Sequence, residues 1–267
     1  MISVCIATHN GAKYIRQQID SILPQLDRDD EILISDDGST DNTTNIIRSY
    51  NSLKINILPP PQTTNDSESI VDSLFYEEFG IIRKVSNNFL NAISYAKGDS
   101  VYLCDQDDVW LPTKVGTCEN LLKKYDVVIH RRTDVDVNLQ HLHLGKENTA
   151  PTEDNRTAGF IQSLIVSHFQ GACMCFTRKI KDEIIRNIDL FHTIPLAHDH
   201  AIGYIALVTC GKDRIKFEPS SQMLYRRHGN NVSPTGEKSR HSLKFKLLYR
   251  LNDLRFYLAL RFRYVFK

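Results

Sequence analysis

Three carboxylates in the stretch VYLCDQDDVW (101–110) are the residues best suited to chemistry. Asp105, Asp107 and Asp108 follow a run of strand-forming residues and precede an apolar pair, so both flanks can be buried. Mg²⁺ and Mn²⁺ prefer oxygen ligands and usually bind through one or two carboxylates together with substrate phosphates. The stretch therefore predicts a divalent cation held against a phosphate group. A solvated acidic loop is the alternative, and the apolar flanks disfavour it.

Polar residues also follow two earlier apolar runs. Thr8 and Asn10 come after the first run, and Asp36 and Asp37 come after the second. A carboxylate at the end of a strand can accept the N3–H of uracil or thymine, a donor that cytosine lacks. Thr8 and Asn10 would then lie within reach of the same base or its ribose. The segment DDGSTD is equally good turn chemistry, so a plain capped turn stays open as the alternative.

Two further candidates lie in the second half of the chain. Asp199 stands at the start of a predicted helix, where the helix dipole favours the ionised carboxylate and would let it act as a base near neutral pH. An ordinary helix cap is the competing interpretation. His228 follows a predicted strand and precedes Gly229, so a neutral imidazole there could complete a metal site. A lone histidine is ordinarily not a ligand.

A regular alternation of strand and helix patterns must position these residues. Buried strand-like runs alternate with amphipathic helical patterns through the first half of the chain. This order predicts an α/β fold with a right-handed, mostly parallel sheet flanked by helices, whose loops at the carboxyl edge are available to a ligand. The predicted strands are 2–7, 31–35, 54–58 and 101–104, and the predicted helices between them include 12–25 and 88–96.

The second half continues the alternation after an interruption. Three prolines open the segment 59–80, which indicates a surface insertion with a short helix near 70–79, either a lid or a plain linker. Further elements are predicted for the remainder of the domain. They are helices at 112–124, 157–168, 178–190 and from 198, and strands at 126–130, 169–177, 214–219 and 222–227.

Composition excludes several classes of function. The 267 residues suit one large α/β domain or a domain with an extension, with 41% hydrophobic and 24% charged residues. The formal net charge of +1 gives no global field that would indicate a nucleic-acid partner. No CxxC or HExxH spacing predicts structural zinc, and the six cysteines lie mostly in apolar runs, as reduced core cysteines of a cytosolic protein do. We expect no secretory signal and no apolar stretch near the ~20 residues of a membrane span.

The last thirty residues, 238–267, differ in kind from the domain before them. They hold nine Lys or Arg and one acid, which gives a formal charge of +8. A leucine stripe runs along the predicted helix, at Leu243, Leu247, Leu251, Leu254 and Leu258. A basic amphipathic helix suits an anionic membrane surface, where each cation contributes about 1 kcal/mol. Packing on the domain and contact with a second subunit are the alternatives.

Four motifs in order resemble a known family. The segments ATHNGAKYIRQQIDSIL, ISDDGSTDNT, NFLNAI and VYLCDQDDVWLPTK are similar to those of the large family 2 of inverting GT-A glycosyltransferases. The motif DQDDVW, a later HDH and a closing YRRHGNNVS resemble the branch that makes bacterial surface polysaccharides, with rhamnosyl- and galactosyltransferase-like members. The resemblance covers residues 1–125 strongly and 170–232 moderately.

The resemblance implies a fold, a reaction and a set of site residues. The fold would be the Rossmann-like GT-A domain at 1–236, with a nucleotide-binding half at 1–110 and an acceptor-binding half at 111–236, followed by the basic tail at 237–267. Asp107 would bind Mn²⁺ or Mg²⁺, with His228 as a weaker second ligand, and Asp199 would be the catalytic base. The residues that would hold the nucleotide sugar are Thr8, Asn10, Asp36, Asp37, Asn88, Asp105 and Gln106.

The implied reaction also predicts partners and a location. The donor would be a UDP- or dTDP-sugar, and the acceptor an oligosaccharide that could be lipid-linked, in the synthesis of capsule, O-antigen or another surface polysaccharide. The protein would be cytoplasmic and peripheral on the inner face of the plasma membrane. The sequence departs from the family pattern at His9, in the missing Asn-x-Gly turn before Asn88, and in the HDH motif. The rival functions are a nucleotidyltransferase and a non-catalytic nucleotide-sugar-binding subunit of a membrane assembly.

Overall fold

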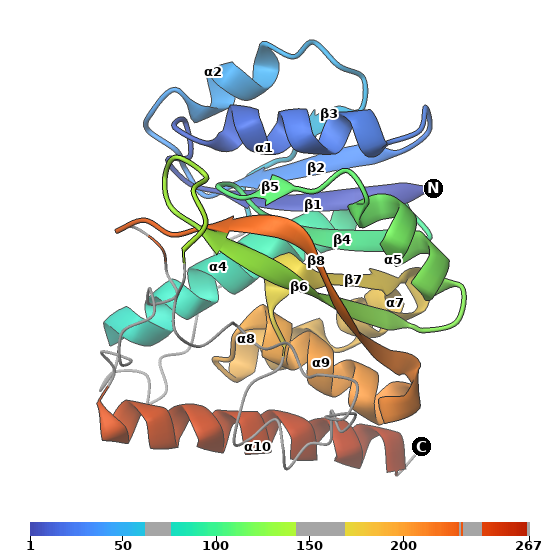
Figure 1. Ribbon diagram of the computed structural model, residues 1–267. Helices are drawn as coiled ribbons and strands as arrows, with labels where there is room; N and C mark the ends of the chain where they lie inside the picture. Colours follow the sequence, from blue (N-terminus) through green and yellow to red (C-terminus); the bar gives the residue numbers. More distant parts are fainter. Residues whose placement is uncertain (62–75, 143–168, 230, 232–241, 266–267) are drawn as a thin grey trace.

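An eight-stranded sheet flanked by helices forms the centre of the protein (Figure 1). The structure is a computed structural model that describes residues 1–61, 76–142, 169–229, 231 and 242–265. The strand order is β3-β2-β1-β4-β7-β6-β8-β5. The strands are β1 (Ile2–Thr8), β2 (Glu31–Asp36), β3 (Ile55–Ile57), β4 (Ser100–Asp105), β5 (Val109–Trp110), β6 (Val127–Val135), β7 (Met174–Thr177) and β8 (Ile215–Arg226).

The first half of the sheet is parallel, as the alternating pattern predicts. Strand β1 pairs in parallel with β2 on one side and with β4 on the other, and β2 pairs in parallel with β3. The strands β1, β2 and β4 are buried almost throughout because helices cover both of their faces. Near-continuous apolar runs such as ISVCIA are typical of parallel strands of this kind, so the positions of these strands could be predicted from the sequence.

The second half of the sheet is mixed. Strand β7 runs antiparallel to both β4 and β6, β6 runs parallel to β8, and β5 runs antiparallel to β8. The parallel pairings outnumber the antiparallel ones, so the predicted mostly parallel α/β sheet is confirmed. The helices are α1 (Ile15–Ile22), α2 (Thr43–Arg48), α4 (Tyr76–Tyr95), α5 (Lys114–Leu122), α7 (Arg178–Arg186), α8 (Ile188–Thr193), α9 (His198–Thr209) and α10 (Leu243–Val265). Short 3₁₀ turns occupy Leu23–Gln25, Gly171–Cys173 and Lys212–Arg214.

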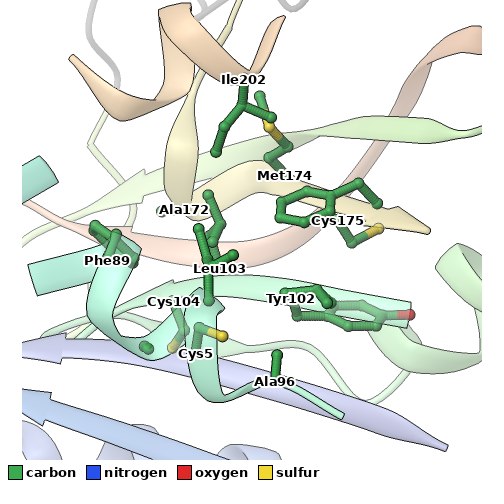
Figure 2. Close-up of a cluster of buried hydrophobic side chains, with 14 of the residues drawn as sticks. Cys5, Phe89, Ala96, Tyr102, Leu103, Cys104, Ala172, Met174, Cys175 and Ile202 are labelled. Carbon is green, nitrogen blue, oxygen red and sulfur yellow. The ribbon is translucent and has the colours of Figure 1, made fainter. Parts of the chain in front are cut away.

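The hydrophobic core is continuous from the first half of the sheet to the second. Figure 2 shows side chains from β1, β4, α4, β7 and α9 meeting in one cluster, with Phe89, Leu103, Met174 and Ile202 among them. No cysteine forms a disulfide, and all except Cys210 are buried. Burial raises the pKa of the buried thiols Cys5, Cys104, Cys173 and Cys175, so they remain protonated and unreactive.

Several predicted elements are wrong in extent. The helix predicted at 88–96 begins at Tyr76, so residues 76–79 of the short helix expected near 70–79 belong to α4, and residues 70–75 lie outside the described residues. The strand predicted at 169–177 is β7 at Met174–Thr177, after a 3₁₀ turn at Gly171–Cys173, and the helix predicted at 178–190 is divided into α7 and α8. The two strands predicted at 214–219 and 222–227 form the single strand β8. A bulge in the pairing of β6 with β8 carries the strand through the polar residues between them. The helix predicted at 157–168 lies outside the described residues.

Helix α10 lies along one side of the domain, next to α9 (Figure 1). Its residues Phe245, Phe256 and Leu260 are buried, so the predicted C-terminal helical extension packs on the domain along one face. None of the helices in the described part of the chain is both long enough and apolar enough to cross a membrane.

Gly98 allows a close backbone contact that generates a testable prediction. A Cβ at this position would lie 2.5 Å from the Ser3 backbone nitrogen and 2.8 Å from the Ser100 carbonyl oxygen. Backbone atoms cannot move aside cheaply, so Gly98→Ala should lower the free energy of unfolding by about 1–3 kcal/mol. Gly116→Ala is the matched control, since its Cβ meets nothing within 4 Å and alanine favours the helix by about 0.5–1 kcal/mol. Urea denaturation of both variants measures the difference, and equal stabilities would contradict the prediction.

Candidate active site

The register of the parallel strands places the predicted nucleotide-binding residues at one edge of the sheet. Thr8 pairs with Asp36 across β1 and β2, and Ala7 pairs with Asp105 across β1 and β4. The carboxyl ends of these strands therefore lie side by side. Asp37 continues this edge, since its amide donates a hydrogen bond to the Thr8 carbonyl at 3.0 Å.

Gln106 joins the acidic loop to the turn after β1. Its Oε1 accepts hydrogen bonds from the Thr8 hydroxyl at 2.7 Å and the His9 amide at 2.9 Å, and its Nε2 donates to the His9 carbonyl at 3.0 Å. A Cβ on Gly11 would lie 2.2 Å from Oε1, so the turn needs a glycine there. Gln106 thus braces the turn, and its predicted contact with the nucleotide stays a prediction.

Asn10 and Asp36 organise the loop after β2. Asn10 has a φ of 50°, a left-handed conformation that asparagine tolerates, and its Oδ1 accepts a hydrogen bond from the Thr40 amide at 2.8 Å. Asp36 accepts a hydrogen bond from the Ser39 amide at 2.9 Å. None of the described residues donates a hydrogen bond to the half-buried Asp37 carboxylate. Asp37 is therefore the hydrogen-bond acceptor at this edge that is best able to bind a nucleobase.

Asn88 lies beneath the same edge. It comes from α4 and is buried, and its Nδ2 donates a hydrogen bond to the Thr8 carbonyl at 3.2 Å. Its Oδ1 is also buried and accepts no hydrogen bond from the residues that the structure describes. Asn88 therefore supports the turn after β1, and its predicted contact with the donor stays a prediction.

The structure brings Asp107 and His228 into direct contact. Oδ2 of Asp107 lies 2.7 Å from Nε2 of His228, although the two residues are 121 positions apart in the chain. The His228 ring stacks on Tyr14, with ring centroids 5.1 Å apart, and its backbone amide donates to Asn231 Oδ1 at 2.6 Å. Both side chains of the pair are about nine-tenths buried.

This pair fits a divalent cation that is completed by a substrate. A carboxylate and an imidazole can both ligate Mn²⁺, and carboxylate oxygen also suits Mg²⁺. Within the described ranges, no group of three or more His, Cys, Asp or Glu side chains could hold a metal ion. A protein that offers only two ligands leaves the other positions to diphosphate oxygens and water, as is usual for these cations.

Arg226 fixes the acidic loop, and the sequence analysis did not identify it. It is buried at the end of β8, its amide donates to Asp108 Oδ1 at 3.0 Å, and its guanidinium donates to the carbonyls of Asp107 at 2.8 Å and Val137 at 2.7 Å. A third guanidinium bond goes to Gln17 in α1. An arginine two residues before His228, at the end of a predicted strand, was the available sequence signal.

Asp108 is held by β8. Its carboxylate accepts a hydrogen bond from the amide of Arg226. Burial, together with the negative charges of Asp107 and Asp105, raises the pKa of Asp108 well above its usual range. Asp108 therefore has a structural contact that ties the acidic loop to β8.

Asp105 lies among other carboxylates. Burial, together with the charges of Asp107 and Asp199, raises the pKa of Asp105 to about 7, against the lowering effect of Arg132 and Lys114. Asp199, although carried by α9, is therefore near enough for its charge to act on Asp105. Charge on a cation at Asp107 would counter this effect and favour ionised Asp105.

Asp199 stands in the first turn of α9, as predicted. Its Oδ2 accepts a hydrogen bond from the Gly171 amide at 3.2 Å, and its Oδ1 accepts one from the His200 amide at 2.9 Å. The side chain is only half-buried, so the Asp199 carboxylate remains accessible from solvent although two backbone amides hold it. A Cβ on Gly171 would lie 2.5 Å from Nε2 of the buried His198, so a larger residue there would disturb this turn.

Helix α10 contacts the residue next to Asp199. His200 Nδ1 lies 2.9 Å from Oδ1 of Asp253, and Asp253 is fully buried. The other oxygen of Asp253 accepts a hydrogen bond from Arg250 at 3.1 Å. Asp253 is the one acid of the basic tail, and this buried contact explains its presence there.

Two more side chains of α10 hold the segment that leads into α9. The Tyr249 hydroxyl accepts a hydrogen bond from the Ala197 amide at 3.2 Å. Nδ2 of the buried Asn252 donates to the Pro195 carbonyl at 3.1 Å. The tail predicted at 237–267 as a separate extension is therefore part of the support for Asp199.

A family comparison decides the class of this site. The family model described as Glycosyl transferase family 2 matches residues 3–185, which include β1, the loop after β2 and the acidic loop. The chain belongs to glycosyl transferase family 2. This result confirms the resemblance on which the implied site residues rest.

Individual relatives agree with this assignment. An uncharacterised glycosyltransferase of Nostoc is 26% identical over 235 residues, which are 86% of this chain and 66% of that protein. The dTDP-rhamnosyl transferase RfbG of Shigella flexneri is 36% identical over 114 residues, which are 41% of this chain and 34% of that protein. The chain thus covers less than two thirds of the length of either relative.

Solved structures show the same fold. TarS of S. aureus in complex with UDP-GlcNAc has a TM-score of 0.59 at 17% identity, over 87% of this chain and 60% of that one. Glucosyl-3-phosphoglycerate synthase from Mycobacterium tuberculosis, in complex with Mn²⁺ and UDP-glucose, has a TM-score of 0.54 at 16% identity, over 86% and 72%. The expected GT-A fold is confirmed.

The contact between Asp253 and His200 predicts measurable coupling. Asp253→Ala leaves a buried imidazole nitrogen without its acceptor, which should cost about 1–3 kcal/mol of unfolding free energy. His200→Ala should then lower the free energy of unfolding less in the Asp253→Ala variant than in the wild type. The difference, measured in a double-mutant cycle, should be about 0.5–3 kcal/mol. Asp182→Ala, at an exposed surface position, is the control and should leave stability nearly unchanged. Strict additivity of the two buried changes would contradict the contact.

Proposed function

We propose that this protein transfers a sugar from a UDP- or dTDP-sugar to an acceptor hydroxyl, with inversion and with the help of Mn²⁺ or Mg²⁺. The observation that carries the proposal is the contact between Asp107 and His228 at the sheet edge, with the Asp199 carboxylate on α9 near enough for its charge to raise the pKa of Asp105. Asp107 and His228 suit a cation that binds the diphosphate, and the Asp199 carboxylate suits the role of general base. A metal ligand pair beside a base is what a direct displacement at a nucleotide sugar requires.

The donor would lie across the carboxyl edge of β1, β2 and β4. Asp37 would accept the N3–H of uracil or thymine, which explains why either nucleoside fits. Asp105 would approach the ribose, and Asp107 with His228 would hold a cation that supplies positive charge to the diphosphate. The remaining proposed donor residues are Thr8, Asn10, Asp36, Asn88 and Gln106. The structures of TarS and the phosphoglycerate synthase, solved with UDP-sugars, support this placement by their shared fold.

Asp199 would start the reaction. Its free lone pair would take the proton of the acceptor hydroxyl while that oxygen attacks the anomeric carbon. The bond from this carbon to the diphosphate oxygen would break on the opposite face, so the configuration would invert in one displacement. The cation, when bound, supplies positive charge that stabilises the departing diphosphate. The amides of Gly171 and His200 hold the Asp199 carboxylate in place for the proton transfer.

The acceptor and the organisation of the chain complete the proposal. An oligosaccharide acceptor of a surface polysaccharide is supported by relatives such as the dTDP-rhamnosyl transferase and, at 31% identity over about half of this chain, the chondroitin synthase of Pasteurella multocida. We assign donor binding to 1–110, acceptor binding to 111–236 and surface attachment to the tail at 237–267. A cytoplasmic protein that is peripheral on the plasma membrane suits a lipid-linked acceptor.

Asp199→Asn tests the proposed base. The amide keeps the shape and its oxygen can still accept one of the two backbone hydrogen bonds, but it cannot take a proton. We expect turnover to fall by about 10²–10⁴-fold, with the affinity for UDP or dTDP unchanged by calorimetry. Asp182→Asn is the control on the exposed surface of α7. Full turnover in Asp199→Asn would exclude it as the base.

Asp107→Asn tests the proposed cation site. Loss of one ligand charge should reduce the Mn²⁺-dependent gain in affinity for UDP about 10–100-fold, and His228→Gln should reduce it less. Asp29→Asn changes an exposed carboxylate before β2, at the other edge of the sheet, and should leave this gain intact. Titration of UDP with and without Mn²⁺ gives the comparison. Equal metal dependence in the wild type and Asp107→Asn would remove the assignment.

Release of UDP or dTDP separates the enzyme from its rivals. A glycosyltransferase should release the nucleoside diphosphate from its sugar donor, slowly with water alone and faster with acceptor. A nucleotidyltransferase would instead consume a nucleoside triphosphate and release pyrophosphate. A binding subunit without activity would release neither product.

A further inference from the structure

Helix α10 has an outer face that the domain does not cover. Its inner face is buried through Phe245, Asn252, Asp253, Phe256 and Leu260. The large apolar side chains of the outer face are exposed, by 50–74% of their surface. These side chains are Leu243, Leu247, Leu251, Leu258, Phe262 and Val265. Side chains of this type on an exposed surface in such number indicate a contact site.

The exposed side chains form one continuous stripe. Successive members are three, four or seven residues apart, which are the spacings of neighbours on one side of an α-helix. The stripe lies opposite the buried residues and runs the whole length of a 23-residue helix, about 33 Å. Leu254, which is half-buried, fills the gap between Leu251 and Leu258. A straight apolar line of this length fits a flat partner.

Positive charge borders the stripe on both sides. Exposed cations at Lys244 and Arg255 lie along one border, and Arg261 lies along the other. The one acid of α10, Asp253, points into the domain and is fully buried. The outer face of α10 therefore offers apolar side chains and cations, with no carboxylate of its own.

We propose that the outer face of α10 lies flat on an anionic lipid surface. The leucines would enter the boundary between headgroups and acyl chains, and the bordering cations would contact the lipid phosphates. A second copy of the chain fits less well, because stripe-to-stripe contact would bring like charges of two α10 helices together without acids to balance them. The proposal concerns attachment alone and goes beyond the transfer reaction.

Vesicle flotation of the full-length protein tests the proposal without any nucleotide sugar. The wild type should float with phosphatidylcholine vesicles that contain 30% phosphatidylglycerol, float at least tenfold less with phosphatidylcholine alone, and detach as salt rises. The double variant Leu247→Gln/Leu258→Gln should bind the anionic vesicles at least tenfold less. The matched control is Leu53→Gln/Ile81→Gln, which changes two exposed apolar residues outside α10 and should bind as the wild type does.

Charge and self-association are tested on the same samples. Lys244→Gln/Arg261→Gln should reduce binding to the anionic vesicles and flatten its salt dependence. Equal flotation of the wild type and Leu247→Gln/Leu258→Gln would overturn the proposal. A wild-type dimer in light scattering that Leu247→Gln/Leu258→Gln converts to a monomer, without vesicle binding by either protein, would overturn it in favour of a second copy. Circular dichroism of each variant verifies that α10 is folded.

Discussion

The buried guanidinium of Arg226 is the contact on which the arrangement of the site depends. A buried charge is costly unless hydrogen bonds satisfy it, and Arg226 is satisfied only when α1, the acidic loop and the segment after β6 meet at the end of β8. This condition fixes the second half of the sheet against the first. His228 lies two residues further along and consequently meets Asp107. The contact between Asp107 and His228 is thus a product of the long-range fold.

The first half of the fold could be predicted because its signals are local. Buried parallel strands leave apolar runs, and the polar residues that follow β1, β2 and β4 must meet at one edge once the strands are in register. That argument alone predicts that Thr8, Asp36 and Asp105 lie close together. The antiparallel course of β7 and the single long β8 were not visible, because pairing partners in a mixed sheet are chosen by contacts between distant segments.

The residues that support the site were missed for the same reason. The resemblance implies that Gln106 holds the nucleotide sugar, and the structure adds that its side-chain amide is hydrogen-bonded to the turn after β1. The tail was predicted either to pack on the domain or to lie on a membrane. The composition of the tail does not tell which residues lie on which face of the helix, and the structure does. On the inner face, Tyr249, Asn252 and Asp253 contact α9 and the segment before it. On the outer face, the leucine stripe is exposed.

The distribution of the thiols has a practical consequence. Five of the six cysteines are buried, and burial raises the thiol pKa of four of them, Cys5, Cys104, Cys173 and Cys175. Cys210, directly after α9, is the partly exposed one. A maleimide dye should therefore modify the folded protein first at Cys210, without any need to remove other cysteines by mutation. That position is at the far end of the helix whose first turn carries Asp199. The natural sequence thus provides a single attachment point from which fluorescence could follow α9 as donor and acceptor bind.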